Sequence, residues 1–170
     1  MKESVYPEFP VILVDDEEQA LDSFEIALRS ANMNHFVRVQ DSRDVMPTLS
    51  GREVEVMLLD LRMPHVSGEE LLLKVNSDFP EIPVIIITGA NDVETAVKCM
   101  KHGAFDYMVK PVEKSRLVSG VRRALELREL QKENRLLKAH VLFDKLQHPE
   151  AFSEIVTNSA GMRSIFQYVE

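Results

Sequence analysis

Five short apolar runs, separated by segments with the apolar period of a helix, constrain the fold of this chain more than any other feature. Each run is four to six residues long, which is the length of a strand rather than of a helix. Apolar strands that alternate with helices are typical of a parallel sheet covered on both faces. We therefore expect an α/β fold with a doubly wound, five-stranded parallel sheet, whose strands are residues 11–14, 35–39, 54–59, 83–88 and 105–109.

The segments between these runs carry helix signals. Asp16 with Gln19 predicts an N-terminal cap for the first helix, and Ser67 with Glu70 forms a capping box for a later one. A last helix begins after Val112 and is expected to continue well past the sheet, to about Leu146. The predicted helical stripes are Ala20, Phe24, Ala27 and Leu28; Leu71, Leu72 and Val75; and Val93, Ala96, Val97 and Met100.

Composition argues against several classes of protein. The chain of 170 residues has a formal charge of -8, and such an acidic chain is a poor candidate for direct binding to DNA or RNA. Cys99 is the sole cysteine, so neither an internal disulfide nor a cysteine metal cluster is possible. No apolar run is long enough to span a bilayer, and the first residues show no signal-peptide pattern. We therefore expect a cytoplasmic protein without a membrane partner.

Polar side chains stand at or just beyond the ends of four of the predicted strands. Because right-handed crossovers bring the carboxyl ends of parallel strands to one edge of the sheet, these side chains should converge there. Open α/β sheets bind ligands at that edge. The converging residues are Asp15, Asp16, Asp60, Thr88 and Lys110.

These residue types favour phosphoryl chemistry around a divalent cation. Three carboxylates in one crevice repel one another unless a cation lies among them, and hard oxygen ligands suit Mg²⁺. An aspartate could then act as a nucleophile toward phosphorus, while Lys110 and Thr88 hold phosphoryl oxygens. The plainer alternative is that Asp15 and Asp16 merely cap the first helix.

Four segments around these residues closely resemble the receiver domain of bacterial two-component response regulators, over roughly residues 8–128. The segments are Val11–Glu17, Leu58–Pro64, Ile85–Gly89 and Gly103–Pro111. This resemblance implies a flavodoxin-like fold and a histidine kinase as phosphoryl donor.

The resemblance also implies a role for each site residue. Asp60 would be the phosphoacceptor and a ligand of Mg²⁺, with Asp16 binding the ion directly and Asp15 largely through water. The backbone carbonyl of Arg62 would complete the protein ligands. The phosphoryl group would be bound by Thr88 and Lys110, the peptide bond between Lys110 and Pro111 would be cis, and Tyr107 would be the switch aromatic. The alternative for Tyr107 is a half-buried strand aromatic without a switching role.

The long last helix carries a second pattern beyond the predicted domain. Apolar residues and one asparagine recur at alternating steps of three and four, which is typical of a coiled-coil seam. A buried asparagine at an a position favours a parallel two-stranded register. We therefore expect a parallel homodimer, with a solvated amphipathic linker as the alternative. The predicted seam is Leu127, Leu130, Asn134, Leu137 and Val141.

The last residues resemble a different domain. Residues 152–166 are similar to the opening of the AAA+ ATPase domain of NtrC-like, sigma-54-dependent activators. The resemblance implies that contacts with sigma-54 RNA polymerase and DNA belong to domains outside this chain. The domain plan is a tail 1–7, a receiver 8–126, a helical linker 127–148 and the start of a truncated ATPase domain 149–170.

Two other functions compete with a phosphorylation-dependent receiver. One is a phosphatase with an aspartyl nucleophile, but such enzymes need a second acid two residues later, where this chain has Arg62. The other is a dimerisation scaffold that works without phosphorylation. No G-x-x-x-x-G-K-[ST] run is present, so ATP hydrolysis by that mechanism is excluded. We expect no enzyme activity beyond self-catalysed phosphotransfer and autodephosphorylation.

Overall fold

The computed structural model describes residues 6–89 and 93–143. Its internal contacts divide the chain into two units, Met1–Arg128 and Glu129–Glu170. The first unit contains the whole sheet. Residues 149–170, for which the sequence predicts the start of an ATPase domain, lie outside the described residues.

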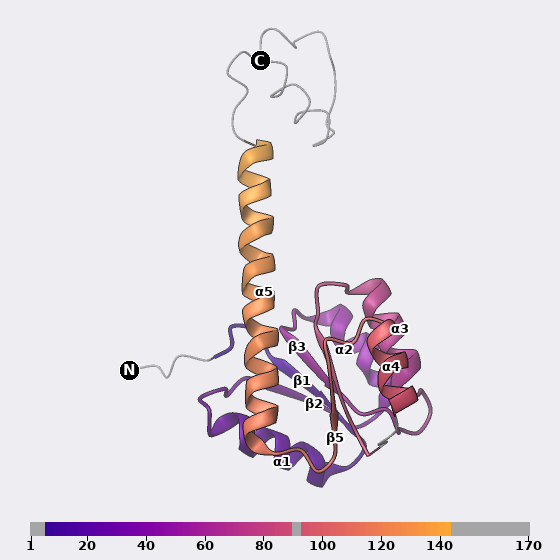
Figure 1. Cartoon of the computed structure of the whole chain (residues 1–170). Coiled ribbons are helices and arrows are strands. Elements are labelled where there is room, and N and C mark those ends of the chain that lie inside the picture. Colours follow the sequence, from indigo (N-terminus) through magenta and orange to yellow (C-terminus); the bar gives the residue numbers. More distant parts are fainter. Residues whose placement is uncertain (1–5, 90–92, 144–170) are drawn as a thin grey trace, which may run out of the picture. The chain divides into compact units, whose positions relative to one another are not determined.

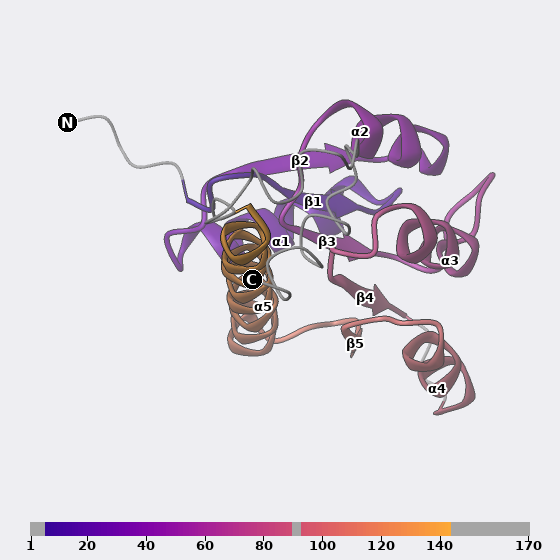
Figure 2. The same cartoon turned by 90° about the horizontal axis from the view of Figure 1, so that it is seen from above.

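The first unit is a parallel α/β sheet, as the sequence predicts. Its five strands follow the order β2-β1-β3-β4-β5, and every neighbouring pair is parallel (Figures 1 and 2). The strands are β1 Val11–Val14, β2 Phe36–Val39, β3 Val56–Leu59, β4 Val84–Thr88 and β5 Asp106–Val109. The helices are α1 Glu18–Arg29, α2 Val45–Gly51, α3 Gly68–Asp78, α4 Val93–Lys101 and α5 Lys114–Phe143, with a 3-10 turn at Ser42–Asp44.

Helices cover both faces of the sheet, which explains why the central strands are apolar throughout. On one face, α2, α3 and α4 pack over side chains such as Ile12 and Leu59. On the other, α1 and the first half of α5 pack over side chains such as Leu13 and Leu58 (Figure 2). Alternate residues of one strand therefore enter two different cores, and neither side of the strand is left polar.

Of the two predicted helix caps, one is wrong and one is confirmed. The cap residue of α1 is Glu17, which makes no side-chain capping bond, so the cap predicted at Asp16 is wrong. The Asp15 side chain instead binds the backbone just before α1, because its Oδ1 accepts a hydrogen bond from the Glu17 N–H at 3.0 Å. The cap of α3 is confirmed: the Ser67 hydroxyl accepts a hydrogen bond from the Glu70 N–H at 3.3 Å.

Helix α4 also differs from its sequence pattern. Of its predicted stripe, Val93, Val97 and Met100 are exposed, and the buried side chain of the helix is Cys99. Helix α4 lies beside the edge strand β5, and Cys99 is its side chain in the core. Among the described residues, no helix is both long and apolar enough to cross a membrane.

Candidate functional site

Three carboxylates meet at the carboxyl edge of the sheet. Strands β1 and β3 are neighbours, with Val14 opposite Leu59, so the residues that follow them emerge side by side. Asp15 and Asp60 are buried, at 1% and 4% exposure, whereas Asp16 is exposed. One carboxylate oxygen from each of these three residues lies within 4.8 Å of the others. We call Asp15, Asp16 and Asp60 the acid cluster.

Lys110 supplies a positive charge to the two buried members of the acid cluster. It follows β5, and its Nζ donates a hydrogen bond to Asp15 Oδ2 at 2.6 Å and lies 3.4 Å from Asp60 Oδ1. Burial raises the pKa of Asp15, although the hydrogen bond from Lys110 opposes that shift. Burial lowers the pKa of Lys110, but the hydrogen bond to Asp15 and the charge of Asp60 outweigh it and bring the pKa above its ordinary value. Lys110 therefore carries a full positive charge at neutral pH.

Backbone hydrogen bonds fix the orientation of the Asp60 carboxylate. The Arg62 N–H donates to Asp60 Oδ2 at 2.7 Å, while Asp60 Oδ1 faces the ammonium of Lys110. The Asp60 N–H donates to the Val14 carbonyl at 2.9 Å, which joins the ends of β1 and β3. The buried Asp60 carboxylate is thus held between the Arg62 N–H and the Lys110 ammonium. Such contacts limit its rotation, as a carboxylate that acts as a nucleophile requires.

Thr88 lies on β4, the neighbour of β3, and Tyr107 lies on the edge strand β5 beyond it. Thr88 is the last residue of β4 and is fully buried, and its carbonyl accepts a hydrogen bond from the Lys110 N–H at 2.9 Å. Tyr107 is half-buried in β5 and packs against the core beneath α2, α3 and α4. The Lys110–Pro111 peptide bond is cis. Four strands thus contribute residues to this edge, as their order in the sequence predicts.

The acid cluster fits a small divalent cation. Its donors are carboxylate oxygens, which are hard ligands of the kind Mg²⁺ takes, and Mg²⁺ needs only one or two of them with water as the remainder. A cation here would also relieve the repulsion between Asp15 and Asp60, a repulsion that raises the pKa of Asp15.

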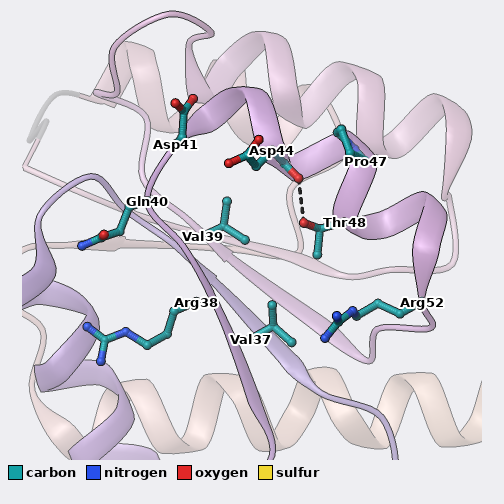
Figure 3. Close-up of a pocket in the computed structure, with 9 residues that line it drawn as sticks. All are labelled: Val37, Arg38, Val39, Gln40, Asp41, Asp44, Pro47, Thr48 and Arg52. Carbon is teal, nitrogen blue, oxygen red and sulfur yellow. Dashed lines mark hydrogen bonds between the residues drawn. The ribbon is translucent and has the colours of Figure 1, made fainter.

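A polar hollow of about 640 Å³ lies elsewhere, between β2 and α2 (Figure 3). Arg38 of the edge strand β2 and Gln40, which follows that strand, line it together with Asp44, Thr48 and Arg52. None of the acid-cluster residues lines this hollow, so it is separate from the site described above.

One residue that no sequence feature marked, Ser42, lies at the same edge of the sheet as the acid cluster. Ser42 is buried, and its hydroxyl contacts the loop that follows Asp60. A serine in a polar turn carries no periodic signal and belongs to none of the four matched segments, so no feature of the sequence marked it.

The predicted seam falls partly within the described residues. Leu127 is half-buried, Leu130 and Leu137 are 63% and 66% exposed, and Asn134 is exposed. The side chain of Val141 lies outside the described residues, as do residues 144–148 of the predicted linker.

Comparison with known proteins identifies the family to which this fold belongs. The family model of the response regulator receiver domain matches residues 11–122, a range that includes every residue of the acid cluster and Lys110. The chain belongs to the response regulator receiver family.

Two relatives of this receiver illustrate the relationship. The C4-dicarboxylate transport transcriptional regulatory protein DctD of Pseudomonas aeruginosa is 33% identical over 159 residues, which are 94% of this chain and 33% of that protein. The regulatory protein AtoC of Escherichia coli is 31% identical over 155 residues, or 91% of this chain and 32% of that protein. The chain therefore spans about a third of the length of these relatives.

Solved structures agree with this assignment. The crystal structure of NtrX from Brucella abortus in complex with ADP superposes with a TM-score of 0.69 at 26% identity, over 94% of this chain and 33% of that one. The beryllofluoride-activated NtrC4 receiver domain dimer gives a TM-score of 0.66 at 29% identity, over 70% of this chain and 98% of that one.

Proposed function

We propose that this receiver accepts a phosphoryl group on Asp60 from a histidine kinase of the cytoplasm. The observation that supports this proposal most directly is the position of Lys110, whose Nζ lies 2.6 Å from Asp15 and 3.4 Å from Asp60. A fixed ammonium beside a buried carboxylate is the arrangement that stabilises charge as phosphoryl oxygens arrive.

In the proposed reaction the Asp60 carboxylate forms a bond to phosphorus while the bond between phosphorus and the donor nitrogen breaks. Lys110 exchanges part of its contact with Asp60 for a phosphoryl oxygen, and the Thr88 hydroxyl donates to another. Asp15, Asp16 and the Arg62 carbonyl would hold Mg²⁺, which supplies charge neutralisation when bound. The Arg62 N–H, 2.7 Å from Asp60 Oδ2, keeps the nucleophile aligned throughout.

The direct test is labelling with a small phosphodonor. The wild-type chain, incubated with acetyl phosphate and Mg²⁺, should gain the mass of one phosphoryl group and stop there. Asp60→Asn should abolish the gain, because the amide is not a nucleophile of this kind. Asp78→Asn, at the exposed end of α3, is the matched control and should label as wild type does. Unchanged labelling of Asp60→Asn would remove Asp60 from the reaction.

We further propose that phosphorylation changes the arrangement of a parallel dimer whose seam is Leu127, Leu130, Asn134, Leu137 and Val141. The exposure of Leu130 and Leu137 supports this, since leucines on a helix surface gain free energy when a partner covers them. Repacking around Tyr107 would carry the signal from the phosphoryl site. By analogy with the transcriptional regulatory proteins it resembles, the chain would control an ATPase domain of a sigma-54-dependent activator, which in turn contacts RNA polymerase and DNA.

Sedimentation and small-angle scattering, with and without beryllofluoride, test this second part. A dimer whose mass or shape changes on adding the phosphoryl mimic is expected. Identical profiles, together with no Mg²⁺ binding, would instead favour a dimerisation scaffold. Repeated turnover of an external phosphate ester would favour a phosphatase.

A further inference from the structure

Ser42 connects two loops at the edge of the sheet where the acid cluster lies. It begins the 3-10 turn after β2 and is 1% exposed. Its hydroxyl donates a hydrogen bond to the Pro64 carbonyl at 2.5 Å and accepts one from the Val66 N–H at 3.0 Å. Both partners belong to residues 61–67, which join β3 to α3 and which we call the Asp60 loop. One buried hydroxyl therefore uses its donor and its acceptor on the same loop.

The Asp60 loop has a strained turn at the point that Ser42 contacts. His65 lies between the two bonded residues with φ 73°, and the Val66 N–H also reaches the Pro64 carbonyl at 3.0 Å. A turn closed over one residue of positive φ is rare and strained for a residue other than glycine. Such a turn persists only when its surroundings hold it. Met63 and Val66, on either side of the turn, pack against the core, but Pro64 and His65 are exposed. The Ser42 hydroxyl is the polar contact that holds the backbone of the turn itself.

The two ends of the Asp60 loop are fixed independently of Ser42. The Arg62 N–H donates to Asp60 Oδ2 at 2.7 Å, and the Gly68 N–H donates to the Leu61 carbonyl at 3.1 Å. Between these ends, the Ser42 contacts are the long-range hydrogen bonds that the structure describes for the middle of the loop. A change at Ser42 should therefore act on the backbone that follows the anchored Arg62 N–H, from the Arg62 carbonyl to Val66, and not on the sheet beneath it.

We infer that Ser42 is a positioning residue for the metal centre, because it holds the Asp60 loop in the conformation that presents the Arg62 carbonyl. This inference rests on the proposed function, in which that carbonyl is a ligand of Mg²⁺. A loop ordered before the ion arrives loses less conformational entropy on binding. Groups that orient the ligands of a metal commonly change its affinity by about 10–100-fold when they are removed.

The test compares three variants of the full chain with the wild type. Ser42→Ala removes both hydrogen bonds, and Ser42→Thr keeps the hydroxyl. Ser50→Ala is the matched control, since that exposed hydroxyl donates to the Met46 carbonyl of its own helix, at 3.0 Å. Isothermal titration should show Mg²⁺ affinity about tenfold weaker in Ser42→Ala than in the wild type. The affinity of Ser42→Thr should lie between those two values or equal that of the wild type, and Ser50→Ala should bind as the wild type does.

A second measurement needs no metal. Hydrogen exchange of the backbone amides of residues 62–68, recorded by NMR in metal-free protein, should be about tenfold faster in Ser42→Ala, while the amides of β1 and β3 keep their protection. Faster exchange throughout the sheet, or a lower unfolding midpoint with unchanged Mg²⁺ affinity, would mean that Ser42 only supports the fold, and would overturn the inference. If Ser42→Ala does not fold, the isosteric Ser42→Cys, which lacks a strong donor, is measured in the same way.

The two measurements separate this inference from the proposed function. Absence of Mg²⁺ binding by the wild type would contradict the proposed function and the metal part of the inference together. Wild-type binding that is unchanged in Ser42→Ala would contradict the inference alone.

Discussion

The guanidinium Nε of Arg128 lies 3.5 Å from Glu55 Oε2, and both side chains are almost fully buried. Arg128 is the last residue of the first unit, and its Nη2 also donates to the Val54 carbonyl at 3.2 Å. Glu55 immediately precedes β3, and Asp60 immediately follows it. The pair thus fastens α5 to the amino end of the strand whose carboxyl end carries the proposed phosphoacceptor.

Removing one partner of this pair should destabilise the first unit strongly. Arg128→Met leaves Glu55 buried without its opposite charge, so the free energy of unfolding should fall by about 3–5 kcal/mol. Urea unfolding followed by circular dichroism measures this loss. Lys74→Met is the control, because its ion pair with Glu70 on the surface of α3 is solvent-exposed and should contribute less than about 1 kcal/mol.

The double variant Arg128→Met with Glu55→Leu should recover most of that stability. Nε and Nη1 of Arg128 make no hydrogen bond with any described residue, so the charged pair is incompletely satisfied and an apolar pair can replace it. A double variant no more stable than Arg128→Met would show that this charge pair is not the main contact.

Lys110→Met should slow phosphorylation without abolishing the fold. Its ammonium is a charge-assisted donor, a contact that contributes about 1.5–3 kcal/mol, so labelling by acetyl phosphate should fall about tenfold or more. Initial rates of mass gain at saturating Mg²⁺ measure this effect. Lys98→Met removes a surface ion pair with Glu69 and should label at the wild-type rate. Equal rates for the two variants would exclude Lys110 from the reaction.

Gly68→Ala should disturb the start of α3 and the Asp60 loop together. A Cβ at this position would lie 2.2 Å from the Asp60 carbonyl oxygen and 2.6 Å from the Leu61 Cα, and these backbone atoms cannot give way cheaply. We expect a loss of about 1–3 kcal/mol in thermal unfolding, with weaker labelling. Gly51→Ala has no atom within 4 Å of its new Cβ, so it should be neutral or slightly stabilising. Equal unfolding midpoints for both variants would show that the close approach at Gly68 is relieved without cost.

The sequence predicted those parts of the fold in which burial requires several consecutive residues to be apolar. Strands buried on both faces must be apolar without interruption, so their positions were recovered to within one or two residues, and the convergence of Asp15, Asp60 and Lys110 follows from parallel topology alone. Helix α2 was not predicted, because its buried side chains are only Val45 and Leu49, and Pro47 interrupts its pattern.

Long-range polar contacts were beyond the reach of sequence reasoning. Arg128 reads as one more charged residue of a solvated helix, yet it is buried against Glu55 across more than seventy positions of the chain. Ser42 likewise reads as a turn residue, yet its hydroxyl serves the Asp60 loop. Such contacts depend on which elements the fold brings together, and the residue type alone does not mark them.

Substitution of two neighbouring leucines can show whether α5 has a specific dimer seam or only a hydrophobic surface. Leu137 occupies the d position and Leu136 the c position of the heptad that begins at Asn134, and the two are about equally exposed, at 66% and 71%. Leu137→Glu should convert a dimer to a monomer in sedimentation equilibrium, because it places two like charges in the interface. Leu136→Glu, one residue away on the same helix, should leave the dimer intact. Dissociation by both substitutions, or by neither, would contradict a seam at these positions, and the solvated linker would then be the better description of residues 127–143.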